Sequence, residues 1–320
     1  MSSLTLDQTA RETLSPLWKK LYQTNRFLLM SVVVYSLLFV ATIALSIMDT
    51  RLVNEAPVWI KPMKFAISSV LYCGTLVWML SFVQRQRFWV NLIGTGTAIV
   101  LLVEIVLIVM QAIRGVRSHF NYSTLFDGAV FSIMGSFILV GWVLNLIAAI
   151  LLMRQEFANA VLAWSVRLGL IITVVGAGMG ATMTLPNTDQ LATIQTGQMP
   201  QFMGAHSVGV EDGGAGLPFT GWSTEGGDLR IAHFVGLHAL QFVPVLGLVI
   251  NRMWADKLEE RRRTRLVWIG AMGYLGLTIL VWWQALRGQA LLAPDSLTVL
   301  ALAVLLVSVT ISAAATILRR

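Results

Sequence analysis

Residues 27–47 read FLLMSVVVYSLLFVATIALSI and contain no charged side chain. An α-helix needs about 20 apolar residues to cross the hydrocarbon of a bilayer. Seven more apolar runs are long enough to do so, at residues 58–82, 88–113, 128–153, 168–185, 231–250, 267–286 and 296–318. Leu, Ala and Gly dominate these runs, which lack the alternation of barrel strands. The pattern predicts an all-α membrane protein with about eight transmembrane helices and the lipid bilayer as its surroundings.

Composition agrees with this fold class. The chain is 56% hydrophobic and 12% charged, whereas about a quarter of the residues in a soluble domain are charged. The single cysteine, Cys73, lies inside the second run, so no disulfide framework is expected. Residues 1–26 are polar, and no small-residue cleavage site follows the first run, so we interpret that run as a retained anchor.

The distribution of basic residues predicts the orientation. With the N-terminus inside, the cytoplasmic segments hold sixteen of the 23 Lys and Arg residues, and the outer segments hold Arg51, Lys61, Lys64, Arg114, Arg117, Arg230 and Arg287. This is the positive-inside pattern. It predicts a plasma (inner) membrane protein with both termini in the cytoplasm. The net charge of +7 therefore indicates topology and not binding to nucleic acid.

Two short motifs occur twice in the chain. IKPMKF at residues 60–65 resembles LRIAHF at 229–234, and QAIRG at 111–115 resembles QALRG at 284–288. Four runs separate the copies, so both copies have the same orientation in the membrane. After a cytoplasmic segment at 1–26, we therefore expect two parallel four-helix repeats, at 27–153 and 154–320, related by a pseudo-twofold axis along the membrane normal.

Residues 186–228, which we call the cap, form the one long connection and belong to the second repeat. Residues 187–195 are predicted to form a short capped helix, and the remainder is rich in glycine. No strand–glycine–helix context and no Gly-Lys-Ser/Thr motif accompanies these glycines, which argues against phosphate binding. Trp222 and Phe219 indicate order, so we expect the cap to lie over the outer mouth of the bundle.

All four histidines fall on the predicted outer side: His119, His206, His233 and His238. The last two are five residues apart, which turns them about 140° around a helix, unlike a chelating pair four residues apart. Histidine is the commonest ligand of haem and transition metals. Each histidine either binds such a cofactor or forms a structural hydrogen bond near the interface.

Glu104 is the only carboxylate well inside an apolar run, about 15 Å from the outer end of its helix. An ionisable group within a membrane is a functional hypothesis by default. The alternatives are that Glu104 is simply protonated, or that it pairs with a base such as Lys64 and so locks the bundle. We take Glu104 and His238 as candidate catalytic residues. The candidate cofactor-binding residues are His119, His233, His238, Arg230, Gln241, Gln111 and Lys64.

The basic residues of the outer rim have two interpretations. They form salt bridges with nearby aspartates, or they bind a small acidic ligand or the acidic group of a cofactor. In a neighbouring run, Gly176 and Gly180 form a Gly-x-x-x-Gly step, which predicts close helix packing. Met179 and Met183 leave a methionine metal site as the alternative.

The layout of two parallel four-helix bundles, with histidines near the outer face and a loop joining them, resembles the haem A synthase family of membrane oxidoreductases. That resemblance implies haem held by a histidine pair on the second and fourth helices of each half. His233 or His238 then matches the first ligand of the second half, and His119 matches a ligand of the first. The chain departs from the family in two places: the eighth run has no histidine, and Lys64 stands where the first half needs its other ligand.

Three functions remain open from the sequence. The first is a membrane oxidoreductase or assembly factor that binds haem or a metal at an outer-leaflet site. The second is a small-solute transporter, and the third is a structural scaffold without catalysis; a homo-oligomer is compatible with each. The polar residues gather at the outer end, and no matching pair of mid-helix breaks is present, which favours the first function over the second.

Overall fold

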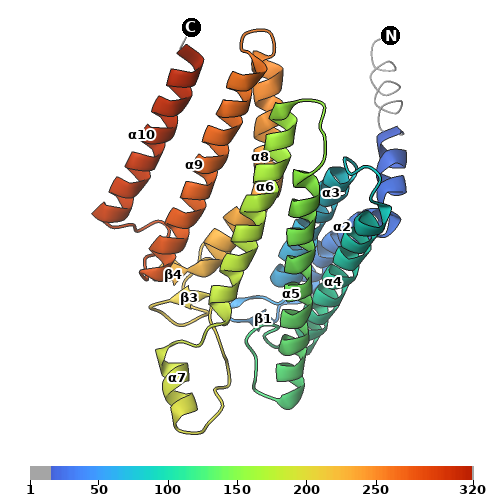
Figure 1. Cartoon of the computed structure of the whole chain (residues 1–320). Coiled ribbons are helices and arrows are strands. Elements are labelled where there is room, and N and C mark those ends of the chain that lie inside the picture. The colour runs from blue at the N-terminus through green and yellow to red at the C-terminus, as the bar shows by residue number, and fades with distance from the viewer. Residues whose placement is uncertain (1–15, 319–320) are drawn as a thin grey trace, which may run out of the picture.

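The computed structural model describes residues 16–318. Eight of the described helices are long and apolar enough to cross a membrane, which confirms the predicted fold class. They are α2 (Arg26–Met48), α3 (Ile60–Leu80), α4 (Arg87–Arg114), α5 (Leu125–Met153), α6 (Ala160–Met179), α8 (Leu229–Trp254), α9 (Glu260–Leu286) and α10 (Ser296–Leu318). Figure 1 shows these helices running side by side, with the cap at one end of the bundle.

The remaining elements are short. Residues 16–24 are helical, a 3₁₀ helix, η1, spans Gly180–Thr184, and α7 spans Thr188–Gln195. Strand β1 (Leu52–Val53) pairs antiparallel with β2 (Ala56–Pro57), in register Leu52↔Pro57. Strand β3 (Ser207–Val208) pairs antiparallel with β4 (Gly227–Asp228), in register Ser207↔Asp228. Each ribbon precedes the second helix of its half, α3 or α8.

Local capping chemistry sets the start of several helices. The side chains of Asn25, Thr124, Asn159 and Asp228 accept hydrogen bonds from backbone N–H groups in the first turns of α2, α5, α6 and α8. These N–H groups have no carbonyl partner within their own helix, so a capping oxygen stabilises the helix start.

The fifth predicted span differs from the structure. The sequence predicted residues 168–185, but α6 begins eight residues earlier, at Ala160. Arg167 interrupts the apolar run in the sequence, yet it is accommodated on the helix. Its guanidinium donates hydrogen bonds to the carbonyls of Leu152 and Gln155 and lies over the ring of Phe157. A charged side chain near the end of a membrane helix can stay within the helix when its hydrogen-bond donors have partners.

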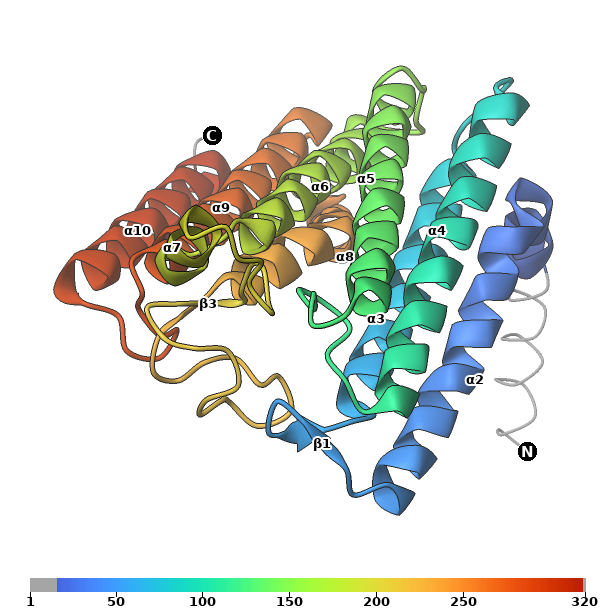
Figure 2. The same ribbon diagram turned by 90° about the horizontal axis from the view of Figure 1, so that it is seen from below.

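The same neighbours pack together in each half. Helix α2 packs on α3 and α4, α3 on α4, and α4 on α5; likewise α6 packs on α8 and α9, α8 on α9, and α9 on α10. The halves meet where α5 packs on α6 and α3 on α8. Viewed from the cap side in Figure 2, the helices extend from α10 at one end to α2 at the other.

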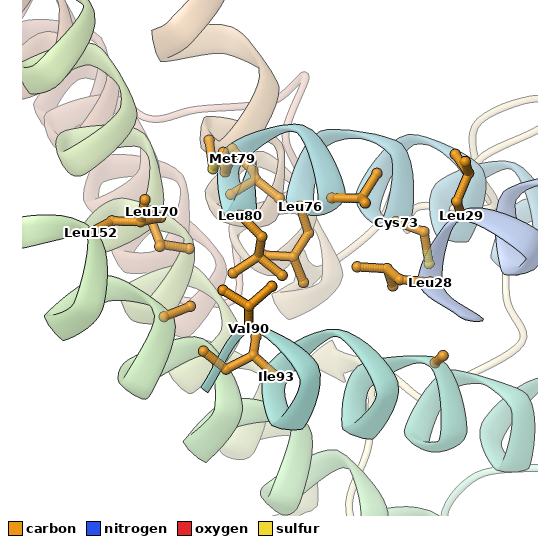
Figure 3. Packing of buried hydrophobic residues seen from close by; sticks show 14 of the residues in the cluster. Leu28, Leu29, Cys73, Leu76, Met79, Leu80, Val90, Ile93, Leu152 and Leu170 are labelled. Atoms are coloured by element: carbon orange, nitrogen blue, oxygen red, sulfur yellow. The ribbon is translucent and has the colours of Figure 1, made fainter. Parts of the chain in front are cut away.

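The largest hydrophobic cluster lies where α3 and α4 meet the helices around them. Figure 3 shows Leu76 and Leu80 of α3 beside Val90 and Ile93 of α4, all buried. The backbones of α6 and α8 lie in close contact at two glycines. A Cβ added to Gly236 would lie only 2.4 Å from the Cα of Gly176. The close packing predicted from the Gly176–Gly180 step is therefore confirmed.

Candidate functional site

The cap is an ordered segment that is attached to both halves. Helix α7 confirms the predicted short helix, with Asn187 and Gln190 forming a reciprocal capping box. On the first half, the N–H of Tyr122 donates to the carbonyl of Gln201. On the second half, Gly227 packs so closely on the α9 backbone at Ala285 that any side chain would collide with it. The cap therefore forms a fixed cover at this end of the bundle.

A line of three polar side chains lies beneath the cap. Lys61 comes from the first turn of α3, His119 from the α4–α5 connection, and Glu104 from within α4. The Lys61 Nζ lies 3.0 Å from His119 Nδ1, and His119 Nε2 lies 3.4 Å from Glu104 Oε1. Glu104 is 2% exposed, and its Oε2 atom has no hydrogen-bond partner.

The neighbours of His119 define its protonation. The Lys61 ammonium can only donate hydrogen bonds, so Nδ1 accepts and Nε2 carries the proton that faces Glu104. The hydroxyl of Ser118 lies 3.1 Å from the same Nδ1. Burial, and then the nearby Lys61 charge, hold the pKa of His119 well below its usual value. The imidazole is therefore neutral and joins the ammonium to the carboxylate.

Two further cations lie close to this line. The Lys64 Nζ donates to the carbonyl of Thr220 at 3.0 Å, and Arg230 Nη2 donates to the carbonyl of Gly221 at 2.5 Å. Arg230 also makes a two-point contact with Asp228, whose side chain is fully buried. Consecutive carbonyls of the cap therefore cover both cations.

His206 of the cap is held against the same region. Its ring lies 4.9 Å from that of Phe120, and its Nδ1 lies 2.9 Å from the carboxylate of Asp212. Burial lowers the pKa of His206, against the opposing hydrogen bond to Asp212. Burial also disfavours ionised Asp212, but hydrogen bonds from His206 outweigh it and keep the pKa of this carboxyl below its usual range.

Salt bridges account for four of the seven basic residues assigned to the outer side. Each of the four arginines contacts an aspartate at 2.5–2.7 Å, in the pairs Arg51–Asp49, Arg114–Asp127, Arg230–Asp228 and Arg287–Asp295. Arg117 instead donates to Asn54 and lies over the ring of Phe202. Lys61 and Lys64 are in none of the ion pairs within the part of the chain that the structure describes.

Several predicted site residues have other contacts. His233 Nδ1 donates to the Gly176 carbonyl at 2.9 Å, and Gly180 leaves room for its ring. His238 Nδ1 donates to the Phe234 carbonyl one turn earlier, at 2.7 Å. Gln241 donates to the carbonyl of Leu71 and the hydroxyl of Thr75, so it joins α8 to α3.

Gln111 belongs to a separate contact. Its amide donates to Asp127 at 2.9 Å, beside the Arg114–Asp127 pair. The structure thus brings together Glu104, His119, Lys64 and Arg230 of the predicted set, with His233 near enough to interact electrostatically with His119. Sequence reasoning placed Lys61 only in the basic rim. Its position three residues before Lys64, on the same helical face, was the available signal.

The described residues contain no group of three or more His, Cys, Asp or Glu side chains arranged to hold a metal ion. Two hollows of the described surface also lie elsewhere. One, of about 450 Å³, is an apolar groove lined by α2 and α4, including Tyr35 and Ile105. The other, of about 320 Å³, lies at the opposite end from the cap and includes Lys20 and Arg85.

No family model, curated protein or solved structure matches this chain. The similarity to haem A synthase therefore rests on the layout alone, and the arrangement of side chains beneath the cap is the basis for a functional proposal.

Proposed function

We propose that this multi-pass membrane protein binds a small anionic compound at the closed polar site beneath the cap. The protein lies in the plasma (inner) membrane with its termini in the cytoplasm and the cap outside. The excess of Lys and Arg in the segments opposite the cap supports this orientation.

The contrast between the paired arginines and Lys64, which is in none of the ion pairs of the described residues, is the observation that supports the proposal best. Four arginines on the cap side are neutralised by aspartates. Lys64 has only a neutral carbonyl as its hydrogen-bond partner, whereas Lys61 has Glu104 as its nearest anion, on the far side of the His119 ring. Removing a cation from water is costly unless an anion or several hydrogen bonds compensate. An anionic ligand would supply that compensation.

The positions of two cap carbonyls also support the proposal. Thr220 and Gly221 direct consecutive carbonyl oxygens at Lys64 and Arg230. A carboxylate or phosphate presents two oxygens with full negative charge in a similar arrangement, and charge-assisted hydrogen bonds are about twice as strong as neutral ones. Displacement of residues 220–221 by an anion would exchange two neutral contacts for two stronger ones. Lys64 would supply a point charge, and Arg230, already oriented by Asp228, would supply a directed donor.

Thermal unfolding of the purified protein with a panel of anions tests this proposal. The panel is inorganic phosphate, acetate and succinate, with chloride at matched ionic strength as the reference. Any anion that binds the folded state raises Tm, by an amount that grows with its concentration. We expect at least one member to do so, Lys64→Gln to remove the shift, and Lys64→Arg to retain it.

Arg51→Gln is the matched control, because Arg51 is an exposed cation on the same side with its own aspartate. It should leave the shift unchanged. An equal shift in wild type and Lys64→Gln would contradict the proposal, as would a panel in which no member differs from chloride.

A haem or metal protein is the second candidate. The rings of His119 and His206 both pack against Phe120, with centroid distances of 6.1 and 4.9 Å, and this gathering of imidazoles is the observation in its favour. An absorption spectrum and elemental analysis of the purified protein separate the two candidates. A Soret band, or a stoichiometric transition metal lost in His119→Ala, would favour the cofactor.

Transport of the bound anion would be an extension of the same proposal. Helix α8 continues through Pro244, and the described spans show no matching pair of mid-membrane breaks. Discontinuous helices are typical of many transporters, so the structure supports binding more directly than passage. Uptake of the stabilising anion into sealed vesicles, compared with binding in detergent, distinguishes a transporter from a receptor.

A further inference from the structure

We propose that Glu104 is a proton-binding site inside the membrane, and that Lys61 and His119 connect it to the cap side. The inference goes beyond anion binding and does not require an anion. It follows from the continuous line of the three side chains and from the unpartnered oxygen at its end.

The geometry sets the direction of the line. It runs from Lys61 Nζ through 3.0 Å to His119 Nδ1, and from His119 Nε2 through 3.4 Å to Glu104 Oε1. The neutral imidazole has one accepting and one donating nitrogen, so it can pass a proton along its ring. His119 lies in the connection between α4 and α5, and Glu104 is inside α4. The line therefore joins the membrane interior to the interface.

Charged groups from every neighbouring element contribute to the site. Glu104 faces Lys61 of α3 through His119, and Lys61 in turn interacts electrostatically with Lys64 of α3, Arg230 of α8 and Asp212 of the cap. His206 and His233 interact electrostatically with His119. Asp127 of α5 is already neutralised by Arg114. Lys61 thus provides the nearest opposite charge for an ionised Glu104.

Proton uptake balances as follows. Lys61 Nζ gives a proton to His119 Nδ1, while the proton on Nε2 passes to Glu104 Oε1. The neutral Lys61 amine then takes one proton from water on the cap side. The net change is one proton added to Glu104, with the imidazole left in its other tautomer; release along the same path restores the first tautomer.

The unpaired Oε2 of Glu104 argues against a purely structural role. A buried ion network formed only for stability should satisfy its polar atoms, because an unsatisfied buried group is costly. Glu104 Oε2 is one of four buried side-chain N or O atoms without a partner in the described part of the chain. Ionisable side chains that connect the membrane interior to one face are typical of proton relays.

Infrared difference spectroscopy tests this proposal without any ligand. The protein is reconstituted in sealed vesicles with the cap outside, and the carbonyl stretch of protonated carboxylic acids is recorded as the external pH is stepped down. We expect a band that grows as external pH falls, is absent in Glu104→Gln, and persists in Glu225→Gln, which alters an exposed cap carboxylate.

A pH jump then tests the path. His119→Asn keeps the carboxylic acid but removes the titratable ring, so the band should follow external pH on the order of 100-fold more slowly. If Glu104→Gln does not fold, Glu104→Asp should shift the band instead of removing it. The proposal would be overturned if the intensity of the Glu104 band did not change with external pH, or changed only with internal pH. Neither result bears on the anion panel, so the two proposals fail separately.

Discussion

The two halves of the molecule end their third helices in the same way. In α4 the sequence QAIRG, and in α9 the sequence QALRG, closes the helix, with Gly115 and Gly288 at φ +71° and +72°. The arginine of each motif then pairs with an aspartate at the start of the next helix, as Arg114–Asp127 and Arg287–Asp295, both at 2.5 Å. This agreement, together with the shared packing order, supports the proposal that the halves are parallel repeats.

The halves differ at the polar line. The offset of 173 residues that superimposes the two motifs places Leu277 at the position of Glu104, and the shorter connection that follows, residues 287–295, contains no histidine. The second half therefore forms the same end of its third helix without a carboxylate at the position of Glu104 and without a histidine in the connection that follows. The four-helix packing therefore does not require the side chains of Lys61, His119 and Glu104. This favours a functional role for the three residues.

Breaking the matched aspartate contacts should give the largest effect. Asp127 has a side chain only 3% exposed and also receives hydrogen bonds from Gln111 and Thr124. Asp127→Ala should lower the free energy of unfolding by about 3–5 kcal/mol, because it leaves buried donors without a partner. Asp295→Ala, at a side chain 40% exposed, should cost clearly less. Denaturant unfolding of both variants in detergent checks the order, which equal losses would contradict.

Installing a carboxylate in the second half sharpens the comparison. Leu277→Glu places an acid in α9 without the base and imidazole that accompany Glu104. It should destabilise the protein by about 2.5–3.5 kcal/mol, the usual cost of a charge at a helix centre in a membrane. Leu277→Gln is the control that separates charge from shape. If Leu277→Glu left the free energy of unfolding unchanged, either half could accommodate a buried acid. The presence of Glu104 in the first half alone would then not indicate a function.

The α6–α8 contact is a third point of difference. Gly236→Ala must push apart two helix backbones and should cost about 1–3 kcal/mol. Gly74 of α3, in the first half, has nothing within 4 Å of an added Cβ. Gly74→Ala should therefore be neutral or slightly stabilising, because alanine favours the helix. Thermal unfolding of the two variants should move Tm in opposite directions, or leave only Gly236→Ala lowered.

The smallest expected effect is a pH dependence. Burial and Lys61 depress the pKa of His119 in the folded protein, so the unfolded chain binds a proton that the folded chain does not. The stability that neutral His119 contributes is complete above about pH 6.5 and is lost as pH falls below that value. His119→Gln should therefore flatten the decline in Tm between about pH 6.5 and pH 5. An unchanged slope would mean that His119 titrates alike in both states.

The sequence predicted the eight spans well because a membrane helix is defined by about 20 apolar residues in a row, a purely local property. The start of α6 was wrong because the contacts that accommodate Arg167 come from residues 152–157, which the run itself does not include. The capped α7 was predicted because Asn187 and Gln190 lie three residues apart, within one turn.

The candidate site was predicted only in part, and the reason is geometric. The position of Glu104 along its helix predicted its depth in the membrane. Its neighbour, His119, comes from the α4–α5 connection. That connection has no periodic sequence pattern, so its path back over α4 could not be predicted. His238 and Gln241 share the helix of Arg230, yet they lie about two and about three turns deeper and contact backbone or α3 instead. Lys61 meets His119 across 58 residues, a pairing that no local signal specifies.

The central claim, that the polar site and the cap above it lie on the outer side of the membrane, is tested most directly by single-cysteine labelling. Cys73 is the only cysteine and is buried, so Cys73→Ala provides the background. Thr224→Cys lies exposed on the cap and Glu156→Cys lies exposed at the opposite end. In intact cells, a membrane-impermeant maleimide should label Thr224→Cys, and it should label Glu156→Cys only after the membrane is opened. Labelling of Glu156→Cys in intact cells, with Thr224→Cys protected, would place the site on the cytoplasmic side and contradict the account.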